Sequence, residues 1–93
     1  MTIDELFQII HDRKEHPVDG SYTNYLFEKG EDEILKKVGE EAMEIILAAK
    51  SQGNNRLVAE VADLTYHLLV LLEERGLTPK AVCDELSRRH RPR

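Results

Sequence analysis

Five carboxylates at helical spacing lie within two apolar segments of the chain. They are Glu40, Glu41, Glu44, Glu60 and Asp63. A carboxylate set without His or Cys suits a hard, oxygen-seeking cation, Mg²⁺ or alternatively Mn²⁺. Gathered together without a cation, these groups would repel one another or become protonated. The pattern therefore indicates a divalent metal site, and metal ions held in this way can bind a polyphosphate.

The spacing places the carboxylates at the edges of two apolar helix faces. On a helix over residues 31–50, Glu41, Glu44 and Glu40 fall at roughly 340°, 280° and 240°, beside an apolar stripe at roughly 0–120°. On the next helix, Glu60 and Asp63 are neighbours at i, i+3 on one edge of the apolar arc. A short Gly-Asn loop favours antiparallel packing of the two helices. Four or five carboxylates are then expected to converge at the lip of the core.

Lys37 shares the helix edge of Glu41 and Glu44, one turn earlier. A cation there could hold a phosphate that also touches the metal, whereas Lys36 points further away. The alternative interpretation is structural, because Glu and Lys are good helix formers that commonly solvate a helix face. Glu41 would then simply pair with Lys37 at i, i+4.

The elements that must position these residues are all helical, because no segment shows convincing strand alternation. Thr2 to Glu5 has the form of a capping box and predicts a first helix. A short helix is expected through Phe27. Asn54 or Asn55 is expected to cap the long helix that follows it. The expected long helices cover residues 31–50, 56–75 and a last segment that starts at Thr78 and Pro79.

Size and charge narrow the class of protein. With 93 residues, one domain with a modest core is expected, and association into an oligomer would add buried surface. A net charge of −5 argues against binding a nucleic-acid backbone. The lone Cys83, which reads as a small core residue, and the acidic first residues favour a reducing cytoplasm. No apolar run approaches a membrane span, and the apolar circumference of residues 56–75 predicts a partner subunit.

Three motifs carry a resemblance to a known family. E-E-x-x-E at residues 40–44, followed by E-x-x-D at 60–63, resembles the signature of the all-α nucleoside triphosphate pyrophosphatases, the superfamily of MazG and the dimeric dUTPases. S-Y-T-x-x-L-F-x-K-G at 21–30 and K-K-V-G-E-E-A-x-E at 36–44 resemble phosphoribosyl-ATP pyrophosphatase of histidine biosynthesis. The likeness continues through the Tyr-His-Leu-Leu run at 66–69 and ends near Leu86.

That resemblance implies a fold and a reaction. The fold would be an all-α, MazG-like bundle of four to five helices, with residues 1–93 as a single domain in an oligomer, at least a dimer. The reaction would be Mg²⁺-dependent hydrolysis of phosphoribosyl-ATP to phosphoribosyl-AMP and pyrophosphate, the second step of L-histidine biosynthesis. The chain is too short for the cyclohydrolase domain that some members carry, so a stand-alone form is expected.

The resemblance also implies roles for individual residues. The metal ligands would be Glu41, Glu44, Glu60 and Asp63, and Glu40 could ligate too, or orient or deprotonate the water. The catalytic candidates are therefore Glu40, Glu41 and Glu44. The substrate-binding candidates are Lys37 and Lys36 for the phosphates, Lys29 as a secondary candidate, and Ser21, Tyr22 and Thr23 for ribose phosphate or base. Thr23 could instead be only a helix cap.

Two other functions remain open from the sequence. A housecleaning pyrophosphatase acting on aberrant nucleoside triphosphates would share the carboxylate site and differ in the substrate pocket. A helical interaction module would carry the acidic edges without catalysis. Tyr66 and His67, one turn after Asp63, are interpreted as packing residues or, alternatively, as functional ones.

Overall fold

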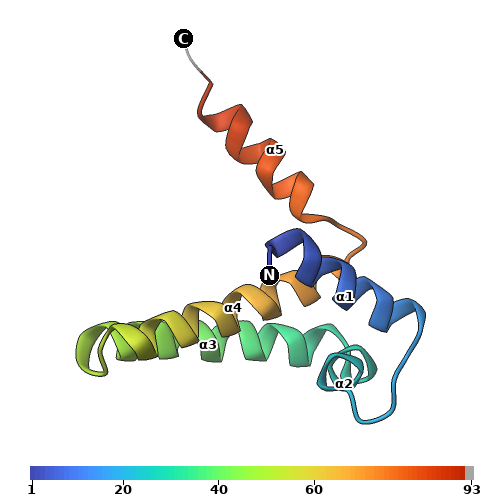
Figure 1. The fold of residues 1–93 in the computed structure, drawn as a ribbon, viewed down its shortest axis with the longest axis horizontal. Coiled ribbons are helices and arrows are strands. Elements are labelled where there is room, and N and C mark those ends of the chain that lie inside the picture. The colour runs from blue at the N-terminus through green and yellow to red at the C-terminus, as the bar shows by residue number, and fades with distance from the viewer. Residues whose placement is uncertain (92–93) are drawn as a thin grey trace.

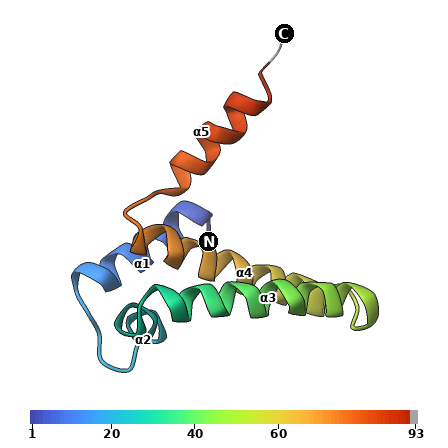
Figure 2. The ribbon, with the colours of Figure 1, turned by 180° about the vertical axis from the view of Figure 1, so that it is seen from behind.

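The computed structural model describes residues 1–91, and within this range every element is a helix, which confirms the all-α prediction (Figure 1). The helices are α1 (Ile3–Glu15), α2 (Tyr22–Lys29), α3 (Glu31–Ser51), α4 (Asn54–Glu74) and α5 (Pro79–Arg89). The long helices α3 and α4 form an antiparallel hairpin. Helices α1 and α2 pack at the end of this hairpin away from its tip (Figures 1 and 2).

The hairpin turns more tightly than the sequence suggests. Gly53 takes φ +86°, a backbone conformation that favours glycine, and stands at the N-terminal cap of α4 without a side-chain hydrogen bond. Asn54 and Asn55 already lie in the first turn of α4, so the prediction that one of them caps this helix is wrong. Only Gln52 and Gly53 separate α3 from α4, and this short connection holds the helices side by side.

The two N-terminal helices begin at side-chain caps. The capping box of Thr2 and Glu5 is confirmed, with Glu5 N–H donating to Thr2 Oγ1 over 3.0 Å. Helix α2 is capped by Ser21, which accepts from Asn24 N–H, so the alternative that Thr23 is the cap is wrong. The buried Asn24 side chain also accepts from Val18 N–H and donates to the Arg13 carbonyl. These bonds fix the loop before α2 against the end of α1.

The core lies where α1 and α2 meet the hairpin. Its buried side chains are Phe7, Ile10, Leu26, Ile34, Leu69 and Val70. Helix α5 begins at the predicted Thr78 cap with Pro79 in its first position, and projects away from the other helices (Figures 1 and 2). Cys83 is exposed because α5 buries none of its residues. The prediction that Cys83 is a core residue is therefore wrong for this single chain.

The surface is larger than that of a compact monomer. The chain exposes 6784 Å², against about 5,500 Å² expected for a monomer of this mass. Large apolar side chains contribute along the hairpin: Leu35, Met43, Ile46, Leu47, Val58, Val61 and Leu68 are all exposed. None of the described helices is both long enough and apolar enough to cross a membrane.

Candidate functional site

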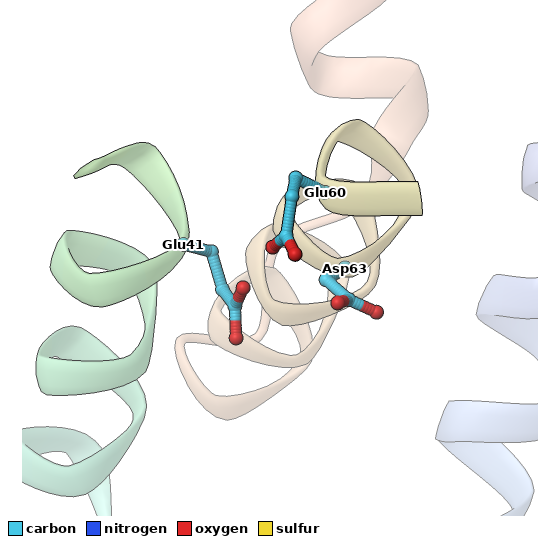
Figure 3. Close-up of side chains that lie close together, drawn as sticks. All are labelled: Glu41, Glu60 and Asp63. Carbon is cyan, nitrogen blue, oxygen red and sulfur yellow. The ribbon is translucent and has the colours of Figure 1, made fainter. Parts of the chain in front are cut away.

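Three carboxylates from the two long helices converge on one point. Glu41 reaches from α3 towards α4, where Glu60 and Asp63 occupy successive turns (Figure 3). One oxygen from each residue lies within 4.8 Å of the other two. Such a triad of oxygen donors fits a hard divalent cation, which takes carboxylate ligands and retains waters. The structure thus brings together Glu41, Glu60 and Asp63 from the predicted ligand set.

Glu60 is the most deeply placed member of this group. Its exposed fraction is 1%, and its Oε1 atom has no hydrogen-bond partner. Arg56, one turn earlier on α4, forms an ion pair with that carboxylate outside hydrogen-bonding geometry. Burying a carboxylate oxygen without a hydrogen bond is costly. A cation between the three carboxylates would remove that cost, so the residues present fit a metal ion.

The charged form of Glu41 is disfavoured in the absence of a cation. Partial burial raises the pKa of the Glu41 carboxyl, and its hydrogen bond to Glu60 and the charges of Asp63 and Glu60 raise it further. Lys37 acts in the opposite direction on that pKa. Metal-free, the triad therefore favours protonation of Glu41. A divalent cation would reverse this preference, because it stabilises the charged carboxylates.

The other two carboxylates on α3 lie outside the triad. Glu44 is half-buried one turn further along α3. Glu40 is exposed, and its Oε1 lies 3.6 Å from Lys37 Nζ. The Lys37 ammonium thus pairs with Glu40 at i, i+3. The structural interpretation of the sequence instead pairs Lys37 with Glu41. Glu44 and Glu40 are near enough in sequence to serve the same site, but they are not part of its three-oxygen centre.

The three candidate lysines differ in their surroundings. Lys37 is half-buried, and the neighbouring Tyr22 phenol and Glu40 carboxylate raise its pKa, so it carries a full positive charge at neutral pH. Lys36 is exposed on α3. Lys29 ends α2, where its Nζ lies 5.9 Å from the centre of the Tyr25 ring. Of the three lysines, Lys37 is the one whose positive charge lowers the pKa of both the Tyr22 phenol and the Glu41 carboxyl.

The Ser-Tyr-Thr segment contacts the helix that carries two of the triad residues. Tyr22 Oη lies 2.9 Å from His67 Nε2, and the Thr23 hydroxyl is hydrogen-bonded to the Tyr66 phenol. Burial is the largest cause of the raised pKa of Tyr22. Ser21 caps α2 and Thr23 is buried, so Tyr22 is the member of the segment that remains exposed beside the triad.

Arg56 is a residue near this site that sequence reasoning missed. Its i, i+4 spacing to Glu60 was the signal that could have identified it. For Tyr66 and His67 the sequence leaves packing and function as alternatives. Their spacing along α4 did not reveal that the first turn of α2 would pack onto them.

The fold and the site together define a class of protein. An antiparallel pair of long helices presents facing carboxylates, and shorter helices cover one end of the pair. This arrangement is that of the MazG-like all-α nucleoside triphosphate pyrophosphatases, as the signature in the sequence predicted.

Comparisons with known proteins specify the family. Residues 3–90 match the family described as phosphoribosyl-ATP pyrophosphohydrolase. The phosphoribosyl-ATP pyrophosphatase of Listeria welshimeri is 60% identical over 87 residues, which cover 94% of this chain and 84% of the relative. That of Pelotomaculum thermopropionicum is 58% identical over 87 residues, 94% of this chain and 89% of the relative. The chain therefore belongs to the phosphoribosyl-ATP pyrophosphohydrolase family.

A third relative joins this family to a second activity. The histidine biosynthesis bifunctional protein HisIE of Caldanaerobacter subterraneus is 53% identical over 89 residues. The match covers 96% of this chain and 43% of that longer protein. The whole described fold, with its carboxylate triad, thus corresponds to less than half of the bifunctional relative.

Proposed function

We propose that the chain hydrolyses phosphoribosyl-ATP to phosphoribosyl-AMP and pyrophosphate in a Mg²⁺-dependent reaction, with Mn²⁺ as an alternative ion. This reaction is the second step of L-histidine biosynthesis, and we place it in the cytoplasm. The names of the relatives support the substrate. The observation that carries the metal dependence is the convergence of the buried Glu60 carboxylate with oxygens of Glu41 and Asp63.

The residues of the triad would hold the ion. Glu41, Glu60 and Asp63 each offer one oxygen, and Glu44 is the residue on the next turn that can serve a further ion or the attacking water. When bound, the ion offsets phosphate charge and lowers the pKa of a coordinated water. Positioning and charge neutralisation dominate catalysis of this kind, so a rigid helical hairpin is a suitable frame for it.

The remaining groups act on the substrate. The ammonium of Lys37 contacts the phosphates, and Lys36 reaches them from the more exposed side. The water oxygen bonds to the α-phosphorus while the bond to the α–β bridging oxygen breaks, and pyrophosphate leaves. A carboxylate takes the proton of the water, and Glu40, which is exposed and paired with Lys37, is one candidate for this role.

The protein works as a homo-oligomer, at least a dimer, in this proposal. The support is the excess surface of the single chain and the row of exposed apolar side chains along α3 and α4. Sedimentation equilibrium at micromolar concentration tests it. Ile46→Lys, in the middle of that row, should shift the mass towards the monomer. A monomeric wild type would contradict the proposal.

A turnover assay tests the substrate assignment. With Mg²⁺ present, phosphoribosyl-ATP should be cleaved with a far higher kcat/KM than any member of a panel of deoxynucleoside triphosphates. Glu41→Gln should abolish the activity on every substrate, which ties the turnover to the triad. Preference for the deoxynucleotides would instead identify a housecleaning pyrophosphatase, and no metal-dependent turnover at all would favour an interaction module.

A further inference from the structure

His67 lies in a hydrogen-bond chain that fixes which atoms carry protons. Only 5% of this residue is exposed, on the turn of α4 that follows Asp63. Its Nδ1 atom lies 2.7 Å from the Asp63 backbone carbonyl, and its Nε2 atom lies 2.9 Å from Tyr22 Oη. A carbonyl only accepts hydrogen bonds, so Nδ1 carries the proton. In the neutral ring Nε2 is then an acceptor, and the phenol of Tyr22 must donate to it.

This assignment decides what Tyr22 can do for a ligand. A phenol has one proton to donate and two lone pairs that accept. With the proton committed to His67, the oxygen of Tyr22 can only accept a further hydrogen bond. Phosphate oxygens at neutral pH also only accept, so Tyr22 cannot bind them. Its ligand partner must instead be a donor such as a sugar hydroxyl.

The ring of Tyr22 is held in place on several sides. It stacks on Tyr25 and Tyr66, with ring centres 5.9 and 6.1 Å away, and meets the His67 ring edge-on at 83°. Even so, 45% of Tyr22 is exposed, so a ligand can reach it. Through His67, which also bonds the Asp63 carbonyl, this phenol is connected to the turn of α4 that carries a triad residue.

We propose that His67 is a positioning residue that fixes Tyr22 as a hydrogen-bond acceptor for a sugar hydroxyl of the nucleotide, and leaves the phosphates to Lys37 and the triad. The inference rests on the proposed function, because it assigns one part of that substrate to one side chain. It narrows the role of the Ser-Tyr-Thr segment from ribose phosphate or base to a sugar hydroxyl.

Binding of the two products separates the sugar from the phosphates. Isothermal titration with phosphoribosyl-AMP and with pyrophosphate, each in the presence of Mg²⁺, should be compared for the wild type and Tyr22→Phe. Loss of one neutral hydrogen bond should weaken phosphoribosyl-AMP by about threefold to tenfold, and pyrophosphate should bind within twofold of the wild type. Weaker pyrophosphate binding, or unchanged phosphoribosyl-AMP binding, would overturn the inference.

A matched control is available between the same two helices. Tyr66→Phe also removes a phenol oxygen that bonds α2 to α4, through Thr23. This variant should lose stability without a change in phosphoribosyl-AMP affinity. If Tyr66→Phe weakens that affinity as much as Tyr22→Phe does, the effect is only loosening of the α2–α4 contact and the inference is wrong.

A double-mutant cycle tests whether His67 acts through Tyr22. His67→Leu alone should weaken phosphoribosyl-AMP by a factor similar to that of Tyr22→Phe, and should add less than twofold in the Tyr22→Phe background. His67→Gln, which offers an acceptor oxygen, should recover part of the affinity. Full additivity in the cycle would show that His67 serves packing alone. Turnover of phosphoribosyl-ATP by the wild type tests the proposed function separately, whatever these variants do.

Discussion

Glu41 on α3 and Glu60 on α4 present their carboxylates to each other across the helical hairpin, with an oxygen of Asp63 within 4.8 Å of both (Figure 3). The hydrogen bond to Glu60 contributes to the raised pKa of Glu41. The two residues meet because the two-residue connection at Gln52 and Gly53 holds α3 and α4 antiparallel. The closeness of these carboxylates destabilises the metal-free protein and stabilises the metal-bound one. These opposite effects on stability can be measured.

Glu41→Gln should stabilise the metal-free protein. The substitution removes one negative charge from the triad while keeping the side-chain size, so Tm in EDTA should rise by about 2–4 °C. Added Mn²⁺ should stabilise the wild type and leave the variant almost unchanged. Differential scanning calorimetry with and without Mn²⁺ provides the measurement. Glu44→Gln, on the same helix but outside the triad, serves as the control, and a lower Tm for metal-free Glu41→Gln would contradict the account.

Glu44→Gln should separate metal binding from chemistry. Because Glu44 lies outside the three-oxygen group, the variant should bind the first Mn²⁺ within about threefold of the wild-type affinity, whereas kcat should fall ~100-fold or more. Titration calorimetry and steady-state kinetics on the same preparation give the two values. An equal loss of metal affinity in Glu44→Gln and Glu41→Gln would place Glu44 among the ligands of the first ion.

Arg56→Gln should strengthen metal binding. The Arg56 guanidinium pairs with Glu60 and so competes with a cation for that carboxylate. Because the arginine is exposed, its removal should raise the Mn²⁺ affinity only by about twofold to fivefold. Arg75→Gln is the matched control, since Arg75 pairs with Glu31 at the far end of the hairpin. If Arg56→Gln binds Mn²⁺ more weakly than the wild type, the arginine supports the site and does not compete for it.

The contact between α1 and α4 should depend on pH through His11. The hydrogen bond from His11 Nδ1 to Glu73 over 2.9 Å, together with the charge of Glu73, raises the pKa of His11. A histidine whose pKa is raised on folding stabilises the protein below its unfolded value of about 6.5, and this contribution disappears as pH rises through the folded value.

Urea denaturation between pH 5 and 9 measures this contribution. The stability of the wild type relative to His11→Gln should be greatest at low pH and should vanish at high pH. His16→Gln is the control, because His16 bonds only Asp12 on its own helix. A difference between the wild type and His11→Gln that grows with pH would have the wrong sign for this contact.

Helix positions could be predicted because they follow from local rules. The capping box of α1, the helical spacing and the glycine at the turn all act over a few residues, so Thr2 and Thr78 identify helix starts in sequence and structure alike. Carboxylates at the edges of two apolar stripes must approach when the helices pack antiparallel. The triad therefore required only the hairpin, and the sequence predicted the hairpin.

The long-range partners were the part that could not be predicted. No local rule shows that Tyr22 would reach His67, or that the Thr23 hydroxyl would bond to Tyr66, since these contacts depend on how α2 packs against α4. The prediction that Cys83 lies in the core follows from the usual burial of small apolar residues. The orientation of α5 exposes it instead, and orientation is a property of the whole chain.

The most direct test of the central claim is a crystal soaked in Mn²⁺ and measured at the manganese absorption edge. The account predicts an anomalous peak bounded by oxygens of Glu41, Glu60 and Asp63, at metal–oxygen distances of about 2.0–2.4 Å. The same peak should be absent from Glu41→Gln crystals. A fully soaked wild-type crystal with no peak among these three carboxylates, or with the ion bound elsewhere, would contradict the account.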